Sequence, residues 1–118
     1  MSLLSEYYSH FLEIQQKYGK QSAVLMVVGS FYEMYSEDEI YLKKICNILN
    51  IQLTKKNKNK ETSKSNPYMC GMPVISLSKH LSKLLIRNYT VAIYDQFDDP
   101  ENSDKKIRKL VNIYSPST

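Results

Sequence analysis

An aromatic ring and a carboxylate two residues apart are the most informative feature of this chain. Phe31 and Glu33 follow Gly29 and an apolar run at residues 23–28. On a β-strand, residues i and i+2 share one face and lie about 6–7 Å apart. A ring that stacks and an acid that hydrogen-bonds, presented together after a glycine turn, can test a single nucleobase. From the pattern alone, however, a core position on an alternating strand is the simpler interpretation of Phe31.

A second group of residues that could take part in chemistry, as ligands of a metal ion, lies near the C-terminal end. Asp95, Asp98 and Asp99 cluster with Glu101, which is a composition that a metal-dependent nuclease could use. A solvated turn beside Pro100 is the simpler interpretation. The metal-dependent nuclease therefore remains a lesser alternative.

The rest of the chain gives little support for an enzyme. Three glycines do not form a phosphate-binding loop, and no Ser/His/Asp order is present. His10 and His80 fall on predicted helices, where surface or capping roles are expected. Cys46 fits a core position, and Cys70, beside a glycine, has no obvious basic neighbour that would activate it. We therefore expect no catalytic residues, no metal and no cofactor in this domain.

Lysines concentrate in one polar segment. Five lysines lie between residues 55 and 64, opposed only by Glu61, in a chain of net charge +4 and pI near 9.0. Such a cluster suits a polyanion, although a solvated loop is the simpler alternative. Lys55, Lys56 and Lys58 are the candidate contacts to a nucleic-acid backbone.

Length and composition indicate one intracellular domain. A chain of 118 residues, 42% hydrophobic, can bury a substantial core. No apolar run is long enough for a membrane span, and no cationic flank precedes an apolar segment at the N-terminus. Two cysteines make neither a disulfide framework nor a zinc site, so a reducing compartment is expected.

Periodicity and capping residues predict an α/β fold with helices packed on a sheet. Ser36 is the predicted N-cap of the second helix because three acidic residues follow it. We expect a mixed sheet of five to six strands with three to four helices. The helices are predicted at 3–18, 36–50 and 76–87, the strands at 22–28, 31–35, 51–54, 67–73, 89–94 and 105–114, a flexible loop at 55–66 and an acidic turn at 97–103.

Five sequence blocks, in order along almost the whole chain, carry a family resemblance. They are Gly-Ser-Phe-Tyr-Glu at 29–33, Leu-Thr-Lys-Lys at 53–56, Gly-Met-Pro-Val-Ile at 71–75, Val-Ala-Ile-Tyr-Asp-Gln at 91–96 with Asp-Pro at 99–100, and Ser-Pro-Ser-Thr at 115–118. Together they resemble the N-terminal mismatch-recognition domain, domain I, of the MutS DNA mismatch repair family.

The resemblance implies a function for the first block. Phe31 would insert beside a mispaired base and stack on it, and Glu33 would hydrogen-bond that base. The partner would be double-stranded DNA with mismatches or small insertion loops. Residues 1–114 would form the domain and 115–118 would begin a linker. The full-length protein would carry an ATPase that uses ATP and Mg²⁺ and would pair with a MutS-type dimer partner.

The chain departs from the family pattern at several positions. Ser30 replaces an aspartate next to Phe31, the residue that would insert into the DNA as a wedge. Ser30 is a further candidate for contact with the DNA backbone. Lys56 replaces an arginine, which keeps the charge but loses a bidentate donor. Val74 and Ile75 replace a Tyr-His pair. These departures indicate a diverged member, viral or organellar. A separate alternative is a paralogue with this fold that acts on branched or recombination DNA; loss of the Phe31 and Glu33 pair would be its signature, and the pair is intact.

Overall fold

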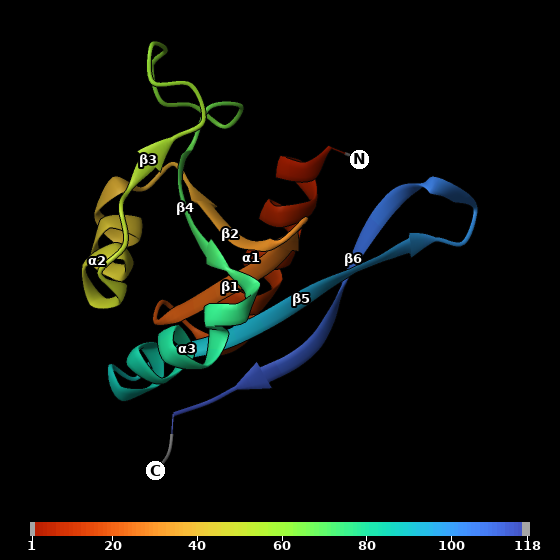
Figure 1. Ribbon diagram of the computed structural model, residues 1–118. Coiled ribbons are helices and arrows are strands. Elements are labelled where there is room, and N and C mark those ends of the chain that lie inside the picture. The colour runs from red at the N-terminus through yellow and green to blue at the C-terminus, as the bar shows by residue number, and fades with distance from the viewer. Residues whose placement is uncertain (1, 117–118) are drawn as a thin grey trace.

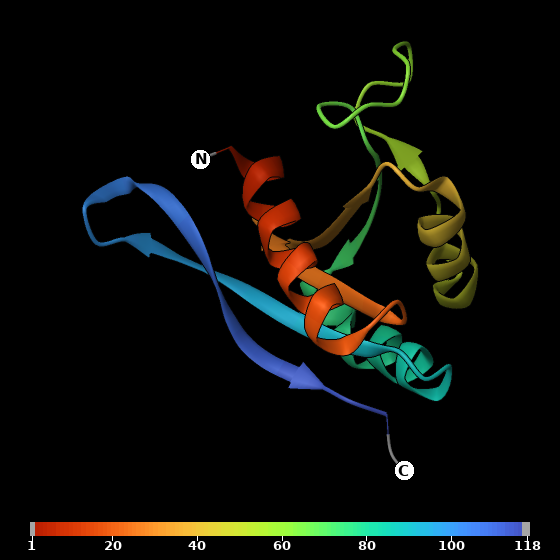
Figure 2. The same ribbon diagram turned by 180° about the vertical axis from the view of Figure 1, so that it is seen from behind.

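One mixed sheet organises the protein. The computed structural model describes residues 2–116, and within them six strands pair in the order β3-β4-β2-β1-β5-β6, accompanied by three α-helices. β1 is parallel to β5, and every other neighbouring pair is antiparallel. Comparison of Figure 1 with Figure 2 shows α1 on one face of the sheet and α3 on the other. The predicted α/β class and the predicted number of strands and helices are confirmed.

The elements in chain order are α1 (Leu3–Tyr18), β1 (Ser22–Val28), β2 (Phe31–Ser36), α2 (Glu39–Leu49), β3 (Thr54–Lys55), β4 (Tyr68–Pro73), the 3-10 helix η1 (Val74–Ser76), α3 (Leu77–Ile86), β5 (Thr90–Asp99) and β6 (Asn102–Tyr114).

The first helix is fixed at both ends and along one face. Ser2 caps α1 by accepting a hydrogen bond from the Ser5 N–H, and Gly19 ends it at a φ of 91°. Tyr7, fully buried on its inner face, donates its hydroxyl to the Val24 carbonyl at 2.8 Å. The ring of Tyr7 also meets Tyr35 edge-on at 5.3 Å. α1 therefore covers the sheet face on which the odd-numbered residues of β2 lie.

Strand β2 has one buried side and one side that opens to solvent. Tyr32 and Met34 are in the core, as the alternation predicted, on the face of the sheet opposite the one that α1 covers. On the other side, exposure rises along the strand from Tyr35, buried beside α1, through Glu33 to Phe31, whose side chain is 47% exposed. The alternative that Phe31 is a core residue is therefore wrong.

Helix α2 begins later than predicted. Its N-cap is Asp38, whose carboxylate accepts from the Tyr41 N–H at 3.1 Å. Ser36 is instead the last residue of β2, paired with Tyr68 of β4, and its hydroxyl accepts from the Asp38 N–H. Pairing with β4 keeps Ser36 extended and moves the start of the helix by two residues. Asn50 ends the helix in a left-handed conformation, as expected.

The predicted loop at 55–66 is more ordered than its composition indicates. Asn66, only 6% exposed, donates its side-chain amide to the carbonyls of Asn57, Lys60 and Glu61 and accepts from the Asn57 N–H. The Tyr8 hydroxyl of α1 donates a hydrogen bond to the Lys64 carbonyl and so attaches the loop to the first helix. The predicted strand at 51–54 is also reduced, because only Thr54–Lys55 pair with β4.

The acidic segment at 97–103 is largely strand and not the predicted turn. β5 runs to Asp99 and β6 starts at Asn102, so the turn narrows to Pro100 and Glu101. Continuous pairing from Tyr94 to Asp98 builds a long two-stranded arm that extends beyond the rest of the sheet in Figures 1 and 2.

β6 ends at Tyr114, and the predicted linker start at 115–118 lies partly outside the described residues. Among residues 2–116, no helix has the length and apolarity that crossing a membrane requires.

Cys46 and Cys70 are free and buried side by side, and the Cys46 thiol together with burial raises the pKa of Cys70. Burial and a raised pKa both disfavour the thiolate form of Cys70, which is the reactive form of a cysteine.

Candidate nucleic-acid interface

A two-residue turn presents the exposed ring. Val28 and Phe31 pair across the β1–β2 hairpin, with Gly29 and Ser30 between them. Gly29 has a φ of 63°, a conformation that glycine adopts without the steric cost borne by other residues. Phe31 thus begins β2 immediately after a tight reversal, and this geometry puts its side chain at the rim of the sheet.

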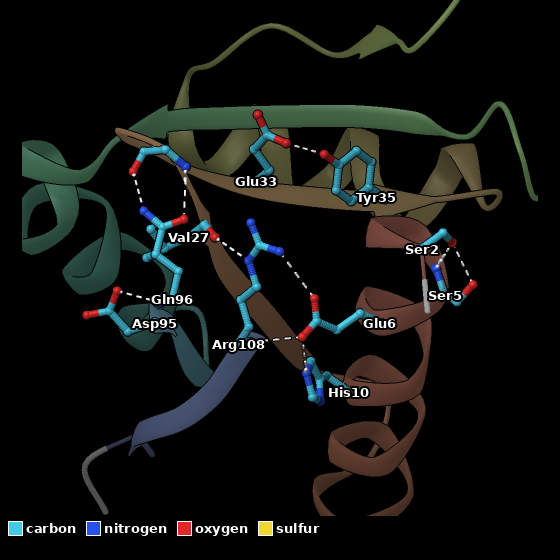
Figure 3. Close-up of polar contacts among 11 residues, drawn as sticks. Ser2, Ser5, Glu6, His10, Val27, Glu33, Tyr35, Asp95, Gln96 and Arg108 are labelled. Atoms are coloured by element: carbon cyan, nitrogen blue, oxygen red, sulfur yellow. Dashed lines mark hydrogen bonds and ion pairs between the residues drawn. The ribbon is translucent and has the colours of Figure 1, made fainter. Parts of the chain in front are cut away.

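Neighbouring elements hold this turn on both sides. The Gln96 side chain, from β5, donates to the Gly29 carbonyl at 3.2 Å and accepts from the Gly29 N–H at 3.3 Å; Figure 3 shows both bonds. The Val74 N–H, from η1, donates to the Ser30 carbonyl at 2.9 Å. The Ser30 side chain is left exposed beside Phe31.

The carboxylate lies two residues further along the same face. Glu33 accepts a hydrogen bond from the hydroxyl of Tyr35, as Figure 3 shows. Burial and this bond raise the pKa of Tyr35, so the phenol remains a donor. Opposite Glu33 on β4 is Gly71, where an added Cβ would come within 2.8 Å of the Tyr32 carbonyl oxygen. The Glu33 carboxylate therefore accepts a hydrogen bond from the buried Tyr35 phenol. Its pairing partner on β4 is a glycine, so no side chain stands opposite Glu33 there.

A cation near this face is already paired. Arg108 of β6 contacts Glu6 of α1 at 3.3 Å, and its Nε donates to the Val27 carbonyl at 3.1 Å. Both members of the ion pair are largely buried, and Figure 3 shows them below Glu33. Within residues 2–116, Glu33 makes no ion pair. Its charge is therefore free of a protein counter-ion, although Tyr35 provides a neutral donor.

The lysines lie at the other end of β2. Lys55 pairs with Tyr68, which pairs with Ser36, the last residue of the strand. Five residue steps and two strand spacings place the backbone of Lys55 roughly 19 Å from that of Phe31. Lys56 and Lys58 are exposed on the loop that Asn66 organises, at the top of Figure 1. The structure thus groups Ser30 with Phe31 and Glu33, and separates the lysines from them.

The acidic residues do not converge. Asp98 pairs with Lys106 at 2.5 Å, Asp99 accepts from the Glu101 N–H, and Asp95 accepts from the adjacent Gln96 N–H. Asp95 and Asp98 also lie on opposite faces of β5, since they are three residues apart on a strand. No three His, Cys, Asp or Glu side chains gather for a metal ion in the described part of the chain. The nuclease alternative therefore gains no support.

Comparison with known proteins decides the family. The family model described as MutS domain I matches residues 6–118. This chain belongs to the MutS domain I family. It is 39% identical to the DNA mismatch repair protein MutS of Petrotoga mobilis over 119 aligned residues, covering 100% of this chain and 13% of that protein. It is 38% identical to that of Thermodesulfovibrio yellowstonii, covering 92% of this chain and 12% of that protein. It is 39% identical to that of Rickettsia typhi, covering 80% and 11% respectively.

Three contacts of this MutS domain I could not be, or were not, predicted from the sequence. Gln96 was noted within a motif, but its contact with Gly29 spans 67 residues and no local pattern shows it. Tyr35 alternates with Glu33 on one face, so the spacing could have indicated the contact. Asn66 lies next to Pro67 in a polar loop, where nothing separates a buried amide from a solvated one.

Proposed function

We propose that this MutS domain I binds double-stranded DNA at mispaired or unpaired bases through the rim of β2. Phe31 enters beside the faulty base and stacks on it, and Glu33 hydrogen-bonds that base. A mispaired base is the easiest to displace from the stack. A wedge that kinks the duplex costs a few kcal/mol of unstacking but brings more protein surface onto the DNA.

The exposure of Phe31 carries this proposal. Phe31 lies at the rim of the sheet, 47% exposed and directly after a turn that is held from two sides, so its ring is available to contact a ligand. An apolar ring inserted between base steps gains contact area, and stacking on a base contributes about 1–3 kcal/mol. The position of Phe31 in the block that resembles the family motif supports the same role.

Glu33 supplies discrimination. Its carboxylate has a donor in Tyr35 but no counter-ion among residues 2–116, so it repels the phosphates of an ordinary duplex. That repulsion is offset only where a base offers Glu33 a hydrogen bond. The residue therefore weakens binding to matched DNA more than binding to mismatched DNA.

Backbone contacts add affinity without sequence information. Ser30, beside Phe31, is placed to contact the phosphates flanking the wedge, and Lys55, Lys56 and Lys58 meet the duplex further along. A separation of roughly 19 Å corresponds to about six base pairs of helix rise. The lysines then bind phosphates about half a helical turn away from the base step that Phe31 enters.

The domain is proposed to act within a larger protein. The chain spans only 11–13% of the MutS relatives that it matches. We infer that residues 1–114 form the mismatch-recognition domain, that 115–118 lead into a following domain, and that this domain itself has no catalytic role. ATP, Mg²⁺ and a dimer partner would be requirements of the full-length protein.

Removal of the wedge tests the function. In the full-length protein, Phe31→Ala should lower the ratio of mismatched to matched affinity by roughly 5- to 150-fold, the equivalent of 1–3 kcal/mol of stacking. Phe97→Ala is the matched control, because Phe97 is 43% exposed on the β5–β6 arm and should leave the ratio unchanged. Binding is measured by fluorescence anisotropy with matched, G·T and single-insertion duplexes. Unchanged discrimination in Phe31→Ala would refute the wedge.

A second substitution tests the acid. Glu33→Gln should keep or raise affinity for matched DNA and reduce the preference for mismatches, with exposed Glu37→Gln as the control. A large equal loss on both DNAs would contradict this role. Binding to branched DNA is measured in the same assay. A preference for four-way junctions over mismatched duplexes would favour the recombination paralogue.

A further inference from the structure

We propose that Gln96 is a positioning residue that fixes the Gly29-Ser30 turn and thereby aims Phe31 at the DNA. This inference rests on the proposed function of Phe31 and adds the residue on which its selectivity depends. Gln96 stands on β5, in a strand separated from β2 by β1, so its role comes from a contact across the sheet.

The contact is made at two points. The Gln96 amide donates to the Gly29 carbonyl at 3.2 Å and accepts from the Gly29 N–H at 3.3 Å. Both backbone polar groups of one residue are thus bound by one side chain, which restrains the orientation of the turn as well as its position. A carboxamide has the donor and the acceptor that this requires, whereas a carboxylate has no donor.

The turn has few other restraints. A Cβ built at Gly29 would meet nothing within 4 Å, so the turn is open on that side of the glycine. The ladder between β1 and β5 ends at the pair Met26 and Tyr94, two residues before Gln96. Within residues 2–116, the one other hydrogen bond to the turn from a neighbouring element runs from the Val74 N–H to the Ser30 carbonyl. Without Gln96, the turn would keep the Val28–Phe31 pairing of its own hairpin but would have a bond from a neighbouring element on the Ser30 side alone.

Phe31 needs this anchorage because its own side chain is not enclosed. With nearly half of its surface exposed, the ring takes its direction from the backbone that carries it. A preformed turn lowers the ordering cost of inserting the ring into the duplex. Loss of the Gln96 contact should therefore weaken the step in which Phe31 enters, and leave the binding of matched DNA to the lysines intact.

A double-mutant cycle in the full-length protein tests this role. Gln96→Ala should lower the ratio of mismatched to matched affinity by about three- to tenfold, which corresponds to the net contribution of a hydrogen bond. In a Phe31→Ala background, Gln96→Ala should have no further effect, because residues that act through one another are not additive. Gln96→Glu keeps the acceptor but sets a carboxylate against the Gly29 carbonyl, and should resemble Gln96→Ala. Exposed Gln16→Ala on α1 is the matched control.

A structural readout accompanies the affinities. Amide hydrogen exchange of the peptide that contains Gly29 and Ser30 should accelerate in Gln96→Ala and remain unchanged in Gln16→Ala. The thermal midpoint of Gln96→Ala should stay near that of the parent protein, since the contact is at the surface.

The outcomes separate the two proposals. If Phe31→Ala keeps its mismatch preference, the proposed function fails. If Phe31→Ala loses the preference but Gln96→Ala keeps it, only the positioning role fails. If Gln96→Ala lowers the ratio by the same factor with and without Phe31, Gln96 contacts DNA independently, and the inference is overturned.

Discussion

Gly71→Ala tests whether the close approach of β2 and β4 sets the place of Glu33. The added Cβ would lie 2.8 Å from the Tyr32 carbonyl oxygen and 3.7 Å from Cγ of Glu33. The first contact is far inside the usual separation of about 3.3–3.6 Å between carbon and oxygen. Because β2 pairs with β1 on one side and β4 on the other, its backbone has no free direction in which to move.

The magnitude follows from two opposing terms. Overpacking of this kind costs about 1–3 kcal/mol. Replacement of glycine by alanine returns about 0.4–1 kcal/mol by restricting the unfolded chain. The net expectation is a loss of about 1–2 kcal/mol in the free energy of unfolding, or a fall of about 4–8 °C in the melting temperature of a chain of this size.

Urea and thermal unfolding of the 118-residue chain measure the stability, and the mismatch-to-matched affinity ratio of the full-length protein measures the function. Gly71→Ala should lower both. Gly19→Ala is the matched control: it strains a left-handed φ of 91° at about 1 kcal/mol but lies at the end of α1, so it should lower stability and leave the ratio unchanged. A Gly71→Ala protein within about 0.5 kcal/mol of the parent, with its preference intact, would refute this reasoning.

Further predictions concern the tyrosines and the lysine loop. The pKa values of buried Tyr7 and Tyr35 and of half-buried Tyr41 are raised chiefly by desolvation, so the folded state holds these protons above the ordinary tyrosine pKa of about 10. Stability should be complete below that pH and fall as pH rises through it, with the tyrosinate absorbance of these three residues appearing together with loss of circular dichroism; ionisation of all ten tyrosines without unfolding would contradict this. Tyr35→Phe should lower mismatch preference while matched affinity holds, since Glu33 loses its donor; an unchanged ratio in the anisotropy assay would show that Glu33 needs no such support. Asn66→Ala should destabilise the chain by about 1–3 kcal/mol, because three carbonyls lose their buried donor, and urea unfolding checks this against Asn59→Ala, an exposed neighbour.

The order of elements could be predicted because local patterns determined it. Spacing of three and four residues marked α1, a valine-rich run marked β1, and Asn50 marked the end of α2. The alternation of β2 also placed Tyr32 and Met34 in the core correctly. Each of these signals comes from residues that are close in sequence and therefore share one helix or strand face.

The errors came from pairing between distant segments. Ser36 has the composition of an N-cap, but its pairing with Tyr68 holds it in a strand. The acidic residues after Tyr94 have the composition of a turn, but pairing with β6 extends them into an arm. For the candidate site, the residues Phe31 and Glu33 could be named from sequence, whereas Gln96 could not, because its partner is 67 residues away.

Photocrosslinking from a mispaired base tests the central claim most directly. A duplex with 5-iodouracil opposite guanine is irradiated with the full-length protein, and the crosslinked residue is identified by mass spectrometry. We predict a crosslink at Phe31 that is strong with the G·iodouracil mispair, weak with the matched A·iodouracil pair and absent in Phe31→Ala. A crosslink that maps instead to Phe97 or to the lysine loop, or one equally strong on matched DNA, would contradict recognition of the mispaired base at the rim of β2.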